Sequence, residues 1–144
     1  MNRRNFFVSG VALGVAASAQ TGNSKLNVSV TYTGSGTVDE AHKVYVVLWD
    51  SPDFVKGDAG GPPIGVQGVT SKSDVAHFEG LSKGPVYVSM VYDPSGKWDA
   101  ASPPPSGSSI GLYAKEPGTP APIQLEPGKT TAVSASFDDS QKIQ

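Results

Sequence analysis

The sequence predicts an all-β protein, folded as a single antiparallel β-sandwich of about seven strands. Three observations lead to this prediction. Short segments place an apolar residue at every second position, which is the period of a strand with one buried face. Gly, Pro, Ser and Asp separate these segments about every 8 to 12 residues, as turns do in a sandwich. After residue 20, the apolar residues show no helical period.

The expected strands follow one another in short segments. In residues 26–32, apolar side chains occupy every second position, which predicts a strand with one buried face. Residues 44–49 and 86–92 are apolar at most positions, so both should be central strands. Prolines exclude the connection from 93 to 111 from any sheet interior, because proline lacks an N–H. The remaining strands are expected at 64–70, 75–78, 110–114, 122–125 and 131–137.

Residues 1–19 are predicted to form a signal helix that is removed as a signal peptide. Arg3 and Arg4 give it a positive start, an apolar stretch follows, and Ala17-Ser18-Ala19 is a small-x-small cleavage site. The apolar stretch is shorter than the roughly 20 residues that a membrane span requires. The protein is therefore expected to be periplasmic or secreted. The remaining chain divides into a linker, a sandwich domain and a frayed polar tail, at 20–24, 25–138 and 139–144.

The first residues also resemble a twin-arginine export signal. The string Asn2-Arg3-Arg4-Asn5-Phe6-Phe7 has a polar residue, two arginines, any residue and a large apolar pair. It departs from that pattern at Asn2, where Ser or Thr is usual. The resemblance implies a domain that folds before export, and the ordinary secretory route stays open as the alternative.

Composition excludes several partners and cofactors. The chain has no cysteine, which excludes disulfides, thiolate zinc sites and a lipid-modified N-terminal cysteine. Signal removal takes away both arginines and leaves nine lysines against thirteen acidic residues, a net charge of −4 with neutral histidines. A weakly acidic domain with scattered lysines is not expected to bind nucleic acid or to insert stably into a membrane.

One longer motif lies in the centre of the chain, Ala76-His77-Phe78-Glu79-Gly80-Leu81-Ser82-Lys83-Gly84-Pro85-Val86-Tyr87-Val88. It resembles the carboxypeptidase regulatory-like domains, whose pattern is small-x-Phe-x-x-Leu-Pro-x-Gly-x-Tyr-x-Val. The chain differs at Ser82, where Pro is usual, and carries the additional Pro85. The resemblance covers about the central third of the chain. It implies a transthyretin-like sandwich used as a stabilising, adhesive or ligand-binding module.

The loop after residue 92 contains a candidate calcium site. Asp93, Ser95 and Asp99, with main-chain carbonyls near Lys97, would offer the hard oxygen ligands that Ca²⁺ takes. The alternative is a type I turn over Asp93-Pro94-Ser95-Gly96, in which Asp93 caps the turn and Gly96 takes the last position. The turn alone accounts for these residues, so we expect no cofactor, with Ca²⁺ as the alternative.

Aromatic residues beside the proline-rich loops are the candidate ligand-binding residues, namely Trp98, Tyr92 and Tyr113. Exposed rings stack on sugar rings through their apolar faces, so a carbohydrate surface is one interpretation. The other is packing, in which Trp98 pins the long loop over one end and the sandwich interior takes Tyr45, Trp49, Tyr87 and Tyr92.

We do not expect an enzyme. His42 and His77 are the only histidines, and with no cysteine they are too few for a catalytic zinc site. The preferred hypothesis is an exported, non-enzymatic binding or accessory module that contacts an unknown protein or carbohydrate partner through the 53–63 and 93–111 loops. The alternatives are a structural or adhesive domain that pairs through an edge strand, and a carbohydrate-binding module.

Overall fold

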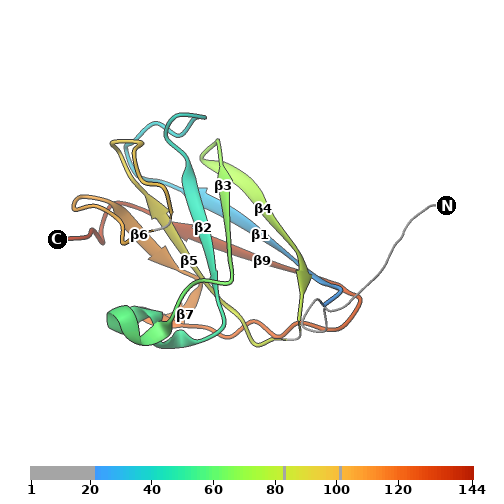
Figure 1. Ribbon diagram of the computed structural model, residues 1–144. Coiled ribbons are helices and arrows are strands. Elements are labelled where there is room, and N and C mark those ends of the chain that lie inside the picture. The colour runs from blue at the N-terminus through green and yellow to red at the C-terminus, as the bar shows by residue number, and fades with distance from the viewer. Residues whose placement is uncertain (1–21, 83, 101) are drawn as a thin grey trace.

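The computed structural model describes residues 22–82, 84–100 and 102–144 and confirms the all-β sandwich (Figure 1). The predicted signal peptide, its twin-arginine-like start and the first part of the predicted linker lie outside the described residues. The helical element of the described chain is a 3₁₀-helix, η1 (Pro52–Gly60). In this described part, no helix is long and apolar enough to cross a membrane.

Two sheets face each other across the core, and Figure 1 shows β2 and β5 passing in front of β1 and β9. The three-stranded sheet has the order β4 (Ser73–Leu81), β1 (Ser24–Tyr32), β9 (Thr130–Phe137). The four-stranded sheet has the order β3 (Gly65–Val69), β2 (Val44–Trp49), β5 (Tyr87–Tyr92), β6 (Ser109–Leu112). A separate small hairpin consists of β7 (Ala114–Glu116) and β8 (Thr119–Pro120).

Alternating burial along the strands produces the core, as the period of two predicts. On β1, Leu26 and Val28 are completely buried, whereas Ser29 and Thr31 face solvent. The same alternation on β2 and β5 directs every second side chain toward β1. Burying one such aliphatic side chain stabilises the fold by about 1.5–3 kcal/mol. The residues buried most completely in this cluster are Leu26, Val28, Val44, Val46, Leu48, Val88 and Met90.

One strand pair differs from the antiparallel prediction. Strands β1 and β9 run parallel, from Lys25 beside Thr130 to Tyr32 beside Phe137, while the other described pairs are antiparallel. The cause is the turn at residues 126–129, which the Ser24 hydroxyl and the Lys25 N–H hold beside the start of β1. A strand that enters a sheet at the end where its neighbour begins must run parallel to that neighbour.

Most expected strands recur with their ends shifted by one to three residues, but two of them do not form single strands. The predicted strand 110–114 is divided between β6 and β7 at Tyr113, whose N–H donates to the carbonyl of Val88. In the predicted strand 122–125, only Ile123 forms a bridge, to Val86. The physical reason is the preceding Pro122, which has no N–H for a ladder.

The C-terminal residues are not the frayed tail that the sequence predicts. The N–H of Ile110 donates to the carbonyl of Gln141 at 2.9 Å, and the N–H of Ile143 donates to the carbonyl of Ser108 at 2.9 Å. The open side of β6 offers unpaired main-chain groups, and these hydrogen bonds satisfy them. The last residues therefore cover one edge of the four-stranded sheet.

Candidate functional site

The loop that follows β5 is organised by one buried carboxylate. Asp93 is 3% exposed, and its carboxylate accepts hydrogen bonds from the main-chain N–H groups of Ser95 (2.9 Å), Lys97 (3.1 Å) and Trp98 (2.9 Å). The Ser95 hydroxyl donates to the same carboxylate at 2.7 Å. The N–H of Gly96 donates to the carbonyl of Asp93, and Gly96 has a φ of 73°. This is the turn that the sequence predicts as the alternative to a metal site.

These hydrogen bonds keep the Asp93 carboxylate ionised and engage it as an acceptor within the protein. Burial alone raises the pKa of Asp93, but the hydrogen bonds from Ser95, Trp98 and Lys97 outweigh burial and lower the pKa below its ordinary value. Asp99, the third predicted calcium ligand, accepts instead from the Ser102 hydroxyl at 3.2 Å. Among residues 22–82, 84–100 and 102–144, no three His, Cys, Asp or Glu side chains gather to hold a metal ion. The expectation of no cofactor, with Ca²⁺ as the alternative, stays a prediction.

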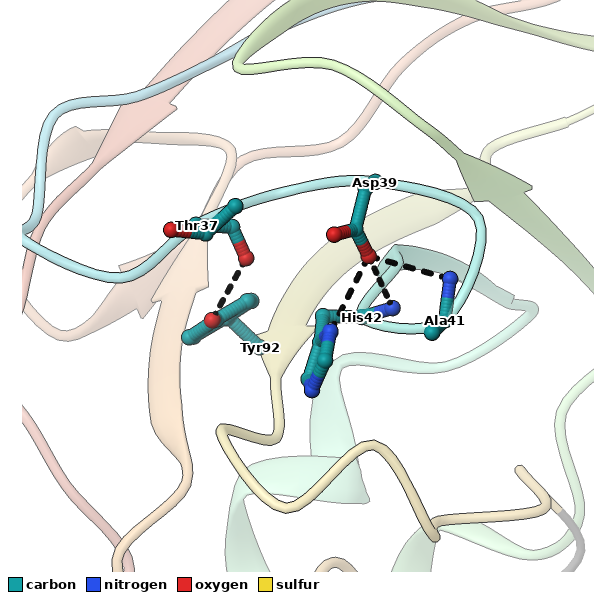
Figure 2. A network of polar contacts seen from close by, with 5 residues as sticks. All are labelled: Thr37, Asp39, Ala41, His42 and Tyr92. Atoms are coloured by element: carbon teal, nitrogen blue, oxygen red, sulfur yellow. Dashed lines mark hydrogen bonds and ion pairs between the residues drawn. The ribbon is translucent and has the colours of Figure 1, made fainter.

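A second loop packs against the Asp93 turn, and Figure 2 shows the contacts that hold it. The Asp39 carboxylate accepts hydrogen bonds from the N–H groups of Ala41 (3.0 Å) and His42 (2.8 Å) and lies 3.0 Å from Nδ1 of His42. The hydroxyl of Tyr92 donates to the carbonyl of Thr37 at 2.7 Å. The two loops touch at Gly96, where a Cβ would lie 2.4 Å from the Ala41 carbonyl oxygen. Glycine is therefore required there for space as well as for its φ.

A third carboxylate secures the C-terminal segment to the same end of the sandwich. Asp139 accepts hydrogen bonds from the hydroxyl of Tyr32, from the Ser109 hydroxyl at 2.7 Å and from the Ser35 N–H at 3.0 Å. These three donors, the Tyr32 hydroxyl foremost, hold the pKa of Asp139 well below its usual range. Burial and then the bond to Asp139 raise the pKa of Tyr32 to about 12. Beneath them, the Tyr32 ring stacks on Tyr92 at 4.8 Å.

The outer face of the four-stranded sheet is unusually well covered. Tyr45, Val47 and Trp49 alternate with the core residues of β2, so they point away from the core. Their neighbours on β5 are Val91, Ser89 and Tyr87. Val47 and Val91 are only 3% and 5% exposed, although they lie on the face of this sheet that points away from the core. The expectation that Tyr45, Trp49 and Tyr87 fill the sandwich is wrong, because the pleat directs them outward.

Two loops supply the cover at opposite ends of β2 (Figure 1). From η1, the ring of Phe54 stacks on Trp49 with centroids 4.8 Å apart and 7° between the planes. From the loop after β5, Trp98 meets Tyr45 edge-on at 5.2 Å. The indole N–H of Trp49 donates to the Ser89 hydroxyl, and the indole N–H of Trp98 donates to the Ser102 carbonyl. The loops 53–63 and 93–111 thus place an aromatic ring each on one sheet face.

The three predicted ligand-binding residues do not form one surface. Tyr92 is 4% exposed and lies in the core. Tyr113 is half-buried and packs against the core cluster. Only Trp98 belongs to the outer face, where its ring contacts Tyr45 and its indole N–H donates to the Ser102 carbonyl of its own loop. The structure adds Tyr45, Trp49 and Phe54 to it, and the sequence signal for the first two was their shared parity on β2.

Our expectation of no enzyme assumes that no serine lies in a Gly-x-Ser-x-Gly motif, and this assumption is wrong. Residues 107–111, Gly-Ser-Ser-Ile-Gly, match the Gly-x-Ser-x-Gly pattern. The central residue, Ser109, lies in β6 and not at a strand-to-helix turn, is 2% exposed, and donates to Asp139. His42 pairs with Asp39, and His77 lies 2.8 Å from Asn27. In this structure Ser109 therefore anchors the C-terminal segment.

Comparison of the chain with protein-family models, with curated proteins and with solved structures returned no match. The fold and the site therefore define the class as a small all-β sandwich, and the arguments about function rest on the residues described above.

Replacing Asp93 with alanine is expected to destabilise the protein by about 2–3 kcal/mol, because three N–H groups lose a charged, buried acceptor. Chemical unfolding of Asp93→Ala, with Asp50→Ala as the exposed control, measures this cost. The control should stay within about 0.5 kcal/mol of the wild type. A turn without metal also predicts the same wild-type melting temperature with Ca²⁺ and with chelator. A shift on chelation would contradict that account and support the calcium alternative.

Asp139→Asn is expected to cost about 2 kcal/mol at pH 7 and progressively less as the pH falls below about 4. The folded-state pKa of Asp139 is depressed, so its contribution is present above the unfolded-state pKa and is lost on acidification. Urea unfolding at several pH values tests this, with Tyr32→Phe as a companion that removes one donor but keeps the ring. A cost that is equal at all pH values would show that Asp139 does not act through its charge.

Proposed function

We propose that this chain is an exported, non-enzymatic binding module whose contact surface is the outer face of the four-stranded sheet with the loops 53–63 and 93–111. The observation that carries the proposal is the pair of aromatic contacts at the two ends of β2, Trp49 with Phe54 and Tyr45 with Trp98. All four rings are half-buried, so each keeps apolar area in contact with solvent. Rings held on a rigid sheet provide contact area at low entropic cost.

The three carboxylates that organise the loops are engaged within the protein, which argues against a catalytic role for them. Asp39, Asp93 and Asp139 each accept several hydrogen bonds that close a loop. An acid or base for catalysis needs free access to a substrate proton, and these carboxylates are engaged by protein donors. Export is supported by the arginine pair, the apolar stretch and the small-residue cleavage pattern of residues 1–19.

Carbohydrate is the ligand class that this surface favours. Sugar rings present flat apolar faces that stack on the rings of Tyr and Trp. Tyr45 and Trp49 are four residues apart on one strand face, which separates them by about 13 Å. An extended oligosaccharide spans this distance, whereas a single sugar ring does not.

Intrinsic fluorescence tests the proposal directly, because both tryptophans of the chain lie on this surface. The probes are soluble cello-, xylo- and chito-oligosaccharides. We expect a saturable fluorescence change with at least one of them, and a loss of affinity of about tenfold or more in Trp98→Ala. Val75→Ala, which trims an exposed apolar side chain on β4 of the other sheet, should keep the affinity within about twofold.

No saturable change with any of the three probes would remove the carbohydrate assignment. Equal weakening by Trp98→Ala and Val75→Ala would remove the outer face as the contact surface. Shortened oligosaccharides after incubation would contradict the non-enzymatic part of the proposal.

A further inference from the structure

The edges of the two sheets are protected to different degrees. An edge strand exposes a row of unpaired N–H and C=O groups, and proteins cover or interrupt such rows to prevent pairing with other chains. In the four-stranded sheet, edge strand β3 is short and contains Gly65 and Gly68. The other edge, β6, is covered by the C-terminal residues, with the N–H of Ile110 bonded to Gln141.

Strand β4, one edge of the three-stranded sheet, is interrupted along its length. The side chain of Asp74 accepts a hydrogen bond from the N–H of Val75 at 2.8 Å, which occupies a donor of the strand itself. Glu79 adds a negative charge, and Gly80 has a φ of 67°. The pairing with β1 also shifts register between Ser24 and Leu26. Charge, a bend and a shifted register are devices that prevent edge-to-edge pairing.

Strand β9, the opposite edge, has none of these devices. Its eight residues, Thr-Thr-Ala-Val-Ser-Ala-Ser-Phe, include no charge, no proline and no glycine. Within the described residues, β9 pairs with β1 and with no other strand. It is the longest edge in the described structure that carries no charge or break.

The hydrogen bonds between β1 and β9 show which main-chain groups of β9 do not pair with β1. The N–H of Lys25 donates to the carbonyl of Lys129, and the N–H of Thr33 donates to that of Phe137. In a parallel pair, alternate residues direct both main-chain groups to the neighbour. The odd-numbered residues of β9 therefore face β1, and the even-numbered residues direct N–H and C=O away from the sheet. All four even-numbered residues are exposed, namely Thr130, Ala132, Ser134 and Ser136.

We propose that β9 pairs antiparallel with β9 of a second copy of this chain, so that the two three-stranded sheets join into one. A two-fold axis at Val133 places Ala132 opposite Ser134 of the other copy, and both residues have free N–H and C=O groups. The register keeps odd residues on the core side in both copies, so Val133 meets its own counterpart there. The half-buried core-side residues of β9 would lose further solvent contact on pairing.

A second copy fits this edge better than an unrelated charged strand does. Two-fold pairing puts each residue near an identical strand, so any charge on β9 would meet a like charge. The absence of charge removes that penalty. The small Thr, Ala and Ser side chains of β9 also let β9 of a second copy approach closely. The edge lies on the sheet opposite the proposed contact surface, so pairing would leave both contact surfaces open. This inference does not depend on the proposed function.

A matched pair of lysine substitutions tests the proposal. Ser134→Lys places a charge on the outer side of β9, where two-fold pairing brings the two lysines close together. Ser29→Lys is the control, because Ser29 is the exposed neighbour of Ser134 on β1, which is paired on both sides. Sedimentation of the purified protein over a concentration series should show a wild-type dimer. We expect Ser134→Lys to weaken dimerisation by about tenfold or more and Ser29→Lys by less than about twofold.

Amide hydrogen exchange separates strand pairing from other kinds of dimer. In the wild type at high concentration, the amides of the four even-numbered β9 residues should exchange slowly. In Ser134→Lys, which remains folded with the same core amides protected, they should exchange as fast as exposed loop amides. A wild type that sediments as a monomer at all concentrations would overturn the proposal. A dimer disrupted equally by both lysines, or with fast even-numbered β9 amides, would overturn it as well.

Discussion

Strands β2 and β5 are buried on both faces, and the arrangement of the loops follows from that constraint. On the inner side, Val46 and Met90 are completely buried against β1. On the outer side, Val47 and Val91 are nearly as well buried, with the half-buried rings of Tyr45 and Trp49 on either side of Val47. A strand that avoids water on two faces requires a layer on each. The loops carrying Phe54 and Trp98 contribute to that second layer, which is why the proposed contact surface is preformed.

Three carboxylates organise the loop end of the sandwich. In a sheet, main-chain N–H groups donate to the neighbouring strand. In these loops, N–H groups and hydroxyls donate instead to the carboxylates of Asp39, Asp93 and Asp139. Their charges also act on Tyr92, whose pKa is raised first by burial and then by these neighbours. Tyr92 therefore stays protonated and keeps donating to Thr37. The Asp93 carboxylate also accepts a hydrogen bond from the N–H of Trp98. The turn therefore fixes the position of Trp98 on the proposed contact surface.

The sequence was sufficient to predict features that depend on neighbouring residues. Period-two alternation predicted the core of β1, and Asp-Pro-Ser-Gly predicted the turn at Asp93, because both are local patterns. Alternation could not show which face of β2 meets the core, since both faces are apolar. The bond between Tyr32 and Asp139 joins residues 107 positions apart, and no local signal marks it. The parallel direction of β9 depends on where the turn at 126–129 docks, which is also a long-range contact.

The most direct test of two-sided burial compares two adjacent valines of β2 that point in opposite directions. Val46→Ala removes methyl groups from the core, and Val47→Ala removes the same groups from the outer face. Urea unfolding should show a similar loss for both, about 1–3 kcal/mol each, because both side chains are buried. A loss of about 1–3 kcal/mol for Val46→Ala with a change within about 0.5 kcal/mol for Val47→Ala would contradict the account, since it would show that the Val47 side chain is in contact with water.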